Sequence, residues 1–471
     1  MTANEMDKAG PLEKDHVEFS IASKNTMEYV EPKGDYSGAT QKTDPVEIRL
    51  VRKLDRRILP ILWAMYFLNY LDRNTLPQAR LNTLEADLNL KGVEYNTAIS
   101  ILFVGYILMQ VPSNMFLTKT KPRIYLSVCM MGWATVSACT AVVQNYQGLV
   151  ACRFLLGFVE APYYPGALYL LSIFYTRKEL ATRISLLYTG QVLSTGCSGL
   201  IAAACFSTLD GVHGIAGWRW LFIIEGVVTF GVAVLGAFLL CDDPSETKWL
   251  TEEERSLAVA RIKKDTVGNQ GRASVWSGLR QACTDPKMWL FVAMQNLHLS
   301  ACSFNNFFPT IIASLGFKSK LAALLLTAPP YFVAGLLGIP FAWSSGKFNE
   351  RTWHITAGLG LAVVGFTMSC STMTTSVRYA STFLYATGAY STPEKKSVSY
   401  GIVNSFANLS YVYTAYLWPS SDSPRYLTGF AAMLAFSVGS IICAWAMRVW
   451  LMAINRKIRR SEDEHQVFYA Y

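Results

Sequence analysis

Four ionisable side chains interrupt long apolar stretches in the first half of the sequence: Asp72, Arg153, Glu160 and Glu225. An ionisable group in apolar surroundings is costly unless it is paired or hydrated, so each is a candidate for a chemical role. A guanidinium stays charged and holds a carboxylate through two parallel hydrogen bonds, so Arg153 is a candidate for binding an anion. The carboxyl groups of Asp72, Glu160 and Glu225 are candidates for binding protons in step with that anion.

The spacing of Arg153 and Glu160 supports a shared role. They are seven residues apart in the sequence, or two helical turns, which places them on one helix face about 10 Å from each other. Two alternatives accompany this hypothesis. Arg153 could pair permanently with Asp72 or Glu225 and only fix helix packing. Arg73 either takes part in ligand binding or extends to the outer lipid headgroups.

Neutral polar residues in the other apolar stretches complete the set of candidates. Imidazole changes its protonation near neutral pH, so His298 is a further candidate for proton binding. The other side chains predicted to contact a ligand are Tyr163, Gln191, Gln295, Asn305 and Asn404. The alternative for His298 and for these residues is ordinary packing or hydrogen bonding between helices.

The elements that must position these residues are membrane-spanning helices. The 471 residues are 52% hydrophobic and 16% charged, whereas a soluble domain carries about 25% charged residues. A span needs about 20 apolar residues. Twelve stretches are predicted as spans, the tenth of them short: 57–78, 97–117, 124–143, 148–172, 184–205, 218–240, 288–312, 320–342, 353–373, 378–391, 397–418 and 426–452. The expected fold is therefore all-α, with two six-helix bundles in a lipid bilayer.

The polar segments divide the chain into five parts. We predict a disordered cytoplasmic tail (1–50), an N-terminal bundle (51–240), a cytoplasmic linker (241–287), a C-terminal helix bundle (288–452) and a cytoplasmic tail (453–471). Lys and Arg gather in the linker and in alternate loops, and loops rich in these residues stay in the cytoplasm. Both termini are therefore expected to be cytoplasmic.

Charge and cysteine usage exclude several other classes of protein. The net charge of +9 comes from short basic clusters between apolar stretches, which is typical of membrane topology and does not indicate nucleic-acid binding. The 10 cysteines include no CxxC motif, so we predict no disulfide framework and no metal site. The sequence also contains no motif that indicates a cofactor, and no cleavable signal peptide is expected.

Several contiguous runs resemble the major facilitator superfamily, and within it the fungal anion:cation symporters of the allantoate permease type. The matching runs lie at 69–74 (NYLDRN), 105–114 (GYILMQVPSN), 152–161 (CRFLLGFVEA), 217–226 (GWRWLFIIEG) and 416–421 (YLWPSS). The group includes carriers of allantoate, nicotinate, pantothenate and biotin. The resemblance implies uptake of a small carboxylate together with protons at the plasma membrane, by alternating access of two bundles.

Two alternatives to uptake stay open at this point. One is an exporter of an acidic metabolite with the same fold. The other is a membrane enzyme or a non-transporting sensor. No nucleotide loop, histidine box or metal cluster favours an enzyme.

The tenth stretch departs from the pattern of the family. The sequence passes from Gly388-Ala389-Tyr390 to Pro393-Glu394-Lys395-Lys396 almost directly. About 12–14 apolar residues remain, which at about 1.5 Å per residue cannot cross a core of about 30 Å. We therefore expect a half-span.

Overall fold

The computed structural model describes residues 44–117, 119–266, 284–317, 319–348, 350–390 and 400–460, which belong to a compact unit beginning at Asp44. All regular structure in these ranges is helical, so the predicted all-α fold is confirmed. Some predictions fall outside the described residues: the disorder of the tail before residue 44, the linker at 267–283, the stretch 391–399 with Pro393–Lys396, and the tail after residue 460.

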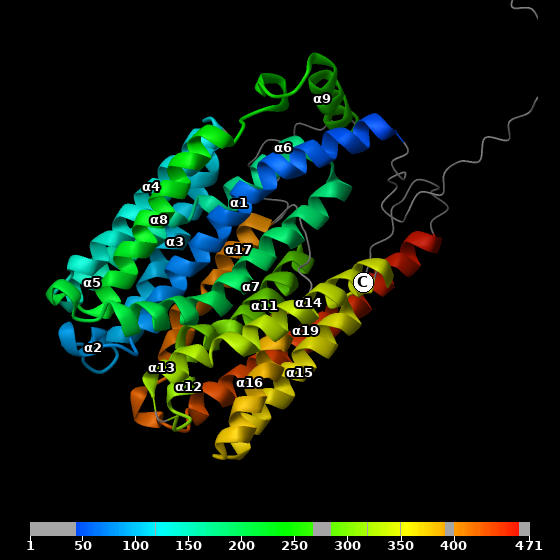
Figure 1. Cartoon of the computed structure of the whole chain (residues 1–471). Coiled ribbons are helices and arrows are strands. Elements are labelled where there is room, and N and C mark those ends of the chain that lie inside the picture. The colour runs from blue at the N-terminus through cyan, green and yellow to red at the C-terminus, as the bar shows by residue number, and fades with distance from the viewer. Residues whose placement is uncertain are drawn as a thin grey trace, which may run out of the picture. The chain divides into compact units, whose positions relative to one another are not determined.

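Six spans form the N-terminal half in the predicted order (Figure 1). They are α1 (Pro45–Ala79), α3 (Glu94–Leu117), α4 (Pro122–Cys139), α5 (Tyr146–Glu160) followed by α6 (Tyr163–Phe174), α7 (Arg177–Thr208) and α8 (Gly217–Leu239), with the short α2 (Leu84–Asp87) between α1 and α3. The first helix begins inside the range predicted for the tail, because Asp44 caps it. Its Oδ1 accepts the backbone N–H of Val46 at 2.8 Å, and Pro45 suits the first turn.

Six spans also form the C-terminal half. They are α11 (Pro286–Cys302) continued by the 3₁₀ turn η5 (Ser303–Phe307) and α12 (Phe308–Ala313), α13 (Lys320–Leu325) with α14 (Ala328–Phe348), α15 (Thr352–Ser371), α16 (Thr375–Tyr390), α17 (Tyr400–Asn408) with α18 (Ser410–Thr414), and α19 (Leu427–Arg460). Helix α11 is capped at its start in the same way as α1. Asp285 Oδ1 accepts the N–H of Lys287 at 3.0 Å, and Pro286 opens the helix.

The helices differ in length as well as in how apolar they are. Among the described residues, six segments are long and apolar enough to cross a membrane: Pro122–Val142, Thr182–Thr208, Gly217–Leu239, Lys320–Ser345, Thr352–Ser371 and Leu427–Arg456. The helices that carry Asp72, Arg153, Gln295 and Asn404 (α1, α5, α11 and α17) are not among them, and α5, α11 and α17 have only 15, 17 and 9 residues. Polar side chains in a bilayer face protein or a hydrated cavity, so these four helices are expected to line the interior.

Four of the described spans are interrupted. The fourth span breaks between Glu160 and Tyr163, the seventh passes through η5, the eighth breaks between Leu325 and Ala328, and the eleventh breaks at Leu409. Non-helical backbone at membrane depth is tolerated where it is buried in protein or lines a cavity. The breaks therefore indicate where the ligand path is to be sought.

Two helix pairs approach closely because glycine leaves room for the neighbouring backbone. A Cβ atom at Gly157 of α5 would lie 1.9 Å from the carbonyl oxygen of Leu102 in α3. A Cβ atom at Gly388 of α16 would lie 2.5 Å from the carbonyl oxygen of Gly358 in α15. Small residues at such crossings allow tight packing of helices in a membrane.

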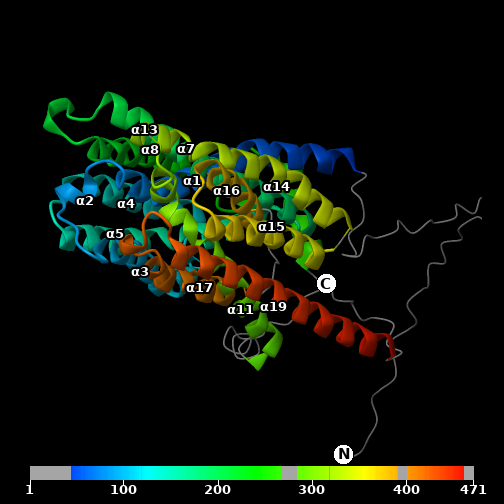
Figure 2. The ribbon, with the colours of Figure 1, turned by 90° about the horizontal axis from the view of Figure 1, so that it is seen from below.

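The two halves meet along α3 on one side and along α7 on the other (Figure 2). Asn96 and Ser100 of α3 donate hydrogen bonds to the carbonyl oxygens of Ala415 and Val412, at 2.8 and 2.9 Å. On the other side, Gly199 of α7 lies against Thr327, just before α14. Both contacts lie toward the end of the molecule that is predicted to be extracellular.

A linker helix, α9 (Glu252–Thr266), is fastened to the opposite end of the N-terminal half. Glu254 binds Lys53 at 2.6 Å. Arg261 pairs with Glu179 at 3.0 Å and donates to the carbonyl oxygen of Phe174 at 2.6 Å. Figure 1 shows the start of α1, helix α9 and the end of α19 toward one end of the structure.

The described part of the tenth span, α16, covers 16 residues up to Tyr390, or about 24 Å. The side chain of Tyr390 lines the central cavity described below. This part of the helix thus reaches the cavity from the predicted extracellular end.

Candidate functional site

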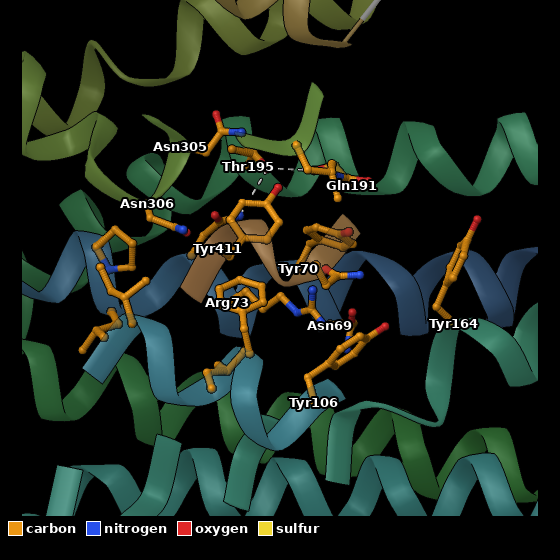
Figure 3. Close-up of a pocket in the computed structure, with 18 of the residues that line it drawn as sticks. Asn69, Tyr70, Arg73, Tyr106, Tyr164, Gln191, Thr195, Asn305, Asn306 and Tyr411 are labelled. Carbon is orange, nitrogen blue, oxygen red and sulfur yellow. Dashed lines mark hydrogen bonds between the residues drawn. The ribbon is translucent and has the colours of Figure 1, made fainter. Parts of the chain in front are cut away.

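A cavity of about 130 Å³ lies between the two halves. Its walls come from α1, α3, α5, α6 and α7 on the N-terminal side, and from α11, η5, α16, α17 and α18 on the other. The interrupted fourth, seventh and eleventh spans all contribute to it. Figure 3 shows polar and aromatic side chains from both halves converging on this space.

Arg73 is the charged residue at the centre of the N-terminal wall (Figure 3). Its Nε lies 2.5 Å from Oε1 of Glu160, and the same oxygen accepts a hydrogen bond from Nδ2 of Asn69 at 2.6 Å. The guanidinium also lies over the rings of Tyr70 and Tyr106, at 5.3 and 4.8 Å from their centroids. Such contacts stabilise a cation in a poorly hydrated site.

This position of Arg73 corrects one interpretation of the sequence. The side chain does not extend to the headgroups, because it is only 15% exposed and points into the protein toward Glu160. The counter-ion of Arg73 is therefore the carboxyl group of Glu160 and not a headgroup phosphate.

Arg153 lies on the same wall and is almost completely buried, with 2% of its surface exposed. Its Nε and Nη2 have no hydrogen-bond partner among the described residues. Its charge acts on Asp72, Glu160 and Glu225, but none of the three forms a salt bridge with it in the described structure. The permanent ion pairs considered for Arg153 are thus not formed, and its Nε and Nη2 are buried without a hydrogen-bond partner among the described residues.

Asp72 and Glu225 lie behind the cavity, inside the N-terminal bundle. Ser137 donates to Oδ1 of Asp72 at 3.2 Å, and Thr75 donates to Oε2 of Glu225. Both residues are buried, with 2% and 3% of their surface exposed. Helices α1, α4 and α8 therefore enclose two carboxyl groups next to the wall that carries Arg153.

The C-terminal wall consists of amides and tyrosines. Asn305 accepts a hydrogen bond from Tyr331 at 2.7 Å, and Asn408 donates to Oδ1 of Asn404 at 3.0 Å. The other residues that this half contributes to the cavity are Gln295, Leu299, Asn306, Tyr390 and Tyr411. Among the described lining residues of this half, none carries a charge at neutral pH.

The structure brings five of the predicted site residues to the cavity: Arg153, Gln191, Gln295, Asn305 and Asn404. Glu160 lies directly behind Arg73 and is joined to it. Asp72 and Glu225 lie one layer further from the cavity.

Tyr163 and His298 lie away from the cavity lining. Tyr163 is buried, and its hydroxyl donates to the carbonyl oxygen of Leu62 at 2.7 Å, which fastens α6 to α1. His298 is buried within α11, where its Nε2 lies 3.8 Å from Sγ of Cys302.

Sequence reasoning left the role of Arg73 open between ligand binding and the headgroups, and it gave no weight to Tyr70, Tyr106 and Tyr411. The sequence did carry a signal for Arg73 and Tyr70. One helix face, at three- and four-residue spacing, holds Tyr66, Asn69, Tyr70 and Arg73. A polar and aromatic stripe at that spacing, on a helix otherwise suited to lipid, indicates an inward face.

Residues 62–447 match the Major Facilitator Superfamily, so the chain belongs to this superfamily. Curated relatives cover most of its length. The MFS-type transporter efuF of Hormonema carpetanum is 30% identical, over 95% of this chain and 94% of its own. The major facilitator-type transporter hxnP of Emericella nidulans is 30% identical, over 91% and 90%. The high-affinity nicotinic acid transporter of Saccharomyces cerevisiae is 28% identical, over 86% and 78%.

Solved structures share the fold at low sequence identity. The tetrameric PepTSo2 has a TM-score of 0.58 at 11% identity, over 86% of this chain and 99% of that one. A bacterial homologue of the human lysosomal transporter Spinster, in an inward-facing and unoccupied conformation, has a TM-score of 0.56 at 17% identity, over 89% and 86%. The predicted major facilitator fold is thereby confirmed. The chain is a multi-pass membrane transporter and not an enzyme.

Proposed function

We propose that this transporter takes up a small organic anion together with protons, by alternating access of its two halves. The observation that carries this proposal is the group of charges beside the cavity. Two arginines, Arg73 and Arg153, adjoin three carboxyl groups, Asp72, Glu160 and Glu225. With all five ionised the group has a net negative charge, which opposes the entry of an anion. Protonation of a carboxyl group removes that opposition, so proton and anion binding favour each other.

Arg73 and Arg153 are the proposed anion ligands. Arg73 faces the cavity but is held by Glu160, whereas Arg153 has two N–H groups without a partner in the described structure. A substrate carboxylate competes with Glu160 for Arg73 and succeeds more easily when Glu160 is protonated. Arg153 is the proposed clamp for the same carboxylate, because a guanidinium can hold it through two hydrogen bonds.

Glu160 and Asp72 are the proposed proton-binding groups, and Glu225 and His298 are the weaker candidates. Glu160 contacts the cation at the cavity directly. Oδ2 of Asp72 has no hydrogen-bond partner among the described residues, and the charge of Arg153 acts on this carboxyl group. Neither Glu225 nor His298 lines the cavity.

Proton coupling also supplies the energy for uptake. Moving one negative charge inward against an inside-negative potential costs about 2.3 kcal/mol per 100 mV. One cotransported proton cancels this cost, and a second adds a net driving force. Accumulation at the plasma membrane, with both termini in the cytoplasm, is the proposed arrangement.

The proposed substrate is a carboxylate of the size of nicotinate, and the proposed subgroup is the fungal anion:cation symporters. The nicotinic acid transporter of yeast, similar over 86% of this chain, supports this choice. Pantothenate, biotin and allantoate are the further carboxylates to be tested.

The deciding experiment is uptake of radiolabelled nicotinate by cells that express the full chain, with pantothenate, biotin and allantoate as competitors. We expect uptake that rises at low external pH, collapses with a protonophore and is lost in Arg153→Ala. Gln144→Leu, which changes an exposed residue, is the control for expression. Efflux without uptake would instead favour an exporter, and movement of none of these acids in either direction would contradict the proposal.

A further inference from the structure

The carboxyl group of Glu160 is held by two donors that come from one face of α1. Nδ2 of Asn69 donates to its Oε1 at 2.6 Å, and Nε of Arg73 lies 2.5 Å from the same oxygen. Asn69 and Arg73 are four residues apart in the sequence, which places them one turn apart on the same helix face. Figure 3 shows them together on the N-terminal wall. Among the described residues, no other side chain forms a hydrogen bond with Glu160.

The two oxygens of this carboxyl group have different surroundings. Oε1 accepts both hydrogen bonds, whereas Oε2 is buried without a hydrogen-bond partner among the described residues. Protonation of Glu160 at Oε2 therefore leaves the bond from Asn69 to Oε1 in place. Asn69 is itself buried, with 3% of its surface exposed, so water does not readily replace its amide.

The two donors differ in what else they can bind. Arg73 lines the cavity and is a proposed anion ligand, so a substrate carboxylate draws it away from Glu160. Asn69 is neutral and gains far less from an anion. An amide carries both a donor and an acceptor, whereas a guanidinium carries donors only. Once Arg73 has turned to the substrate, Asn69 is the remaining described partner of Glu160, and a buried carboxyl group without any partner is costly.

The charged and titratable neighbours of Glu160 do not replace this amide. They are Arg73 and Asp72 from α1, Tyr106 from α3 and Arg153 from α5. Of these, only Arg73 forms a hydrogen bond with Glu160 in the described structure. The amide of Asn69 is therefore the partner of Glu160 that neither a substrate anion nor a proton removes.

We propose that Asn69 is a positioning residue for proton coupling, which holds Glu160 in place while Arg73 moves between Glu160 and the substrate anion. The inference deepens the proposed function and rests on it. The bond from Asn69 to Oε1 stabilises the carboxylate after Arg73 has left, and it persists when a proton binds at Oε2. Glu160 can therefore exchange Arg73 for a proton without changing its position.

Infrared spectroscopy of the purified full chain in lipid nanodiscs tests this bond without any substrate. The carbonyl stretching band of protonated Glu160 is expected in acid-minus-neutral difference spectra and is identified by its loss in Glu160→Gln. A hydrogen bond to the carbonyl oxygen lowers the frequency of this band, so we expect Asn69→Leu to move the band to a higher wavenumber. Asn69→Ala, with a smaller side chain, should show the same shift and serves if the leucine prevents folding.

Gln78→Leu is the matched control. Gln78 lies on the same helix, has 4% of its surface exposed and donates from Nε2 to the hydroxyl of Ser198 at 3.1 Å. The variant also loses a buried amide bond, but one to a neutral partner, so the band of Glu160 should stay where it is in the parent. An equal shift in Gln78→Leu would show a general loosening of α1 and overturn the inference.

Exchange kinetics test what the bond does for transport. The measurement is counterflow of radiolabelled nicotinate in proteoliposomes at equal pH on both sides. In Asn69→Leu we expect KM to rise about tenfold, because Arg73 then leaves behind a buried carboxylate without a partner. In the Glu160→Gln background the same substitution should change KM by less than about threefold, since the charge that Asn69 stabilises is absent. Gln78→Leu should keep the KM of the parent.

The outcomes separate the inference from the proposed function. An unshifted band in both Asn69 variants, the absence of any band that Glu160→Gln removes, or equal effects of Asn69→Leu in the two backgrounds would overturn the inference. A shifted band without movement of nicotinate, pantothenate, biotin or allantoate would instead reject the proposed function and the coupling role, and would leave Asn69 as a residue that positions Glu160.

Discussion

The two halves of this transporter share a helical plan but equip the central cavity with opposite chemistry. The N-terminal wall presents Arg73 and Arg153, with three carboxyl groups behind them. The described part of the C-terminal wall is neutral, and its polarity comes from amides near two interrupted spans. In the proposed mechanism, the N-terminal half binds the anion and the protons, and the C-terminal half recognises the rest of the substrate.

The physical basis of this division is the number of helices that enclose each charge. Arg73 and Glu160 join α1 to α5, and Thr75 and Glu225 join α1 to α8. Several helices packed around α1 can supply partners for buried charges. In the C-terminal half, η5 and the break at Leu409 lie next to the cavity. Neutral side-chain amides can form hydrogen bonds with the backbone groups that a helix break exposes.

The largest effect is expected from removing the cation at the centre of the charged wall. Arg73→Ala should reduce uptake by about a hundredfold or more, because truncating one partner leaves Glu160 buried without its counter-ion and removes an anion ligand. Arg73→Lys should restore little, since an ammonium lacks the planar fork of a guanidinium. Initial uptake rates at saturating and limiting substrate measure both variants. An uptake rate of Arg73→Ala within threefold of the parent would contradict the contrast between the charged wall and the neutral wall.

The carboxyl groups should control coupling more than binding. In Glu160→Gln and Asp72→Asn we expect loss of acid-driven accumulation, while exchange of labelled for unlabelled substrate continues. The amide of each variant mimics the protonated carboxyl group, so the anion can bind without a proton. Counterflow in proteoliposomes at equal pH measures exchange, and uptake under a pH gradient measures coupling. Unchanged accumulation in both variants would place proton binding elsewhere, with His298 as the next candidate.

The neutral wall should affect affinity without affecting coupling. Asn305→Ala and Asn404→Ala are expected to raise KM by about tenfold, the size of a lost hydrogen bond to a buried partner. The dependence of uptake on external pH should keep its midpoint. A shifted midpoint in either variant would show that the two walls do not divide their tasks. The comparison between these variants and Glu160→Gln is therefore the sharpest test.

The linker helix should matter for stability and little for the cavity. Arg261→Ala removes the ion pair with Glu179 and the bond to the carbonyl oxygen of Phe174. We expect the free energy of unfolding to fall by about 1–3 kcal/mol, which lowers Tm in detergent, with an unchanged pH profile of uptake. Lys263→Ala, at an exposed site on the same helix, is the matched control.

The smallest effect is expected from the half-buried pair that joins Lys53, near the start of α1, to Glu254 of α9. The hydrogen bond from Lys53 lowers the pKa of Glu254 below its ordinary value of 4.5. This contribution to stability is therefore full above pH 4.5 and is lost as the pH falls through the lower folded-state pKa. In Lys53→Met the loss of Tm between pH 5 and pH 3 should be smaller than in the parent, by less than about 1 kcal/mol in free energy. An equal loss in both proteins would show that the pair contributes nothing.

Much of the architecture could be predicted from hydropathy and charge alone. The twelve stretches correspond to the observed helices because a span must be apolar over about 20 residues. The runs around Asp72, Arg153 and Glu225 also pointed to the superfamily. The breaks at Pro162 and Asn305–Asn306 fall at a proline and at two amides inside otherwise apolar stretches, a signal that the predicted spans did not use.

Partners across helices could not be predicted from the sequence. The spacing of Arg153 and Glu160 suggested a shared face, yet Glu160 binds Arg73 on another helix. Tyr163 was a plausible ligand contact, but its hydroxyl points to the backbone of α1. In both cases the rotation of one helix against its neighbour decides the outcome, and hydropathy does not encode that rotation.

By itself, the sequence determined that the chain lies in a membrane, how often it is predicted to cross, and which buried groups can carry charge. These properties follow from the cost of transferring single residues into lipid, which is local. Only the tertiary structure decided which of those charges face the cavity, which are held by a partner, and that the described part of the opposite wall is neutral. Those properties depend on close packing at distances of a few ångströms between residues far apart in the chain, and no local pattern determines them.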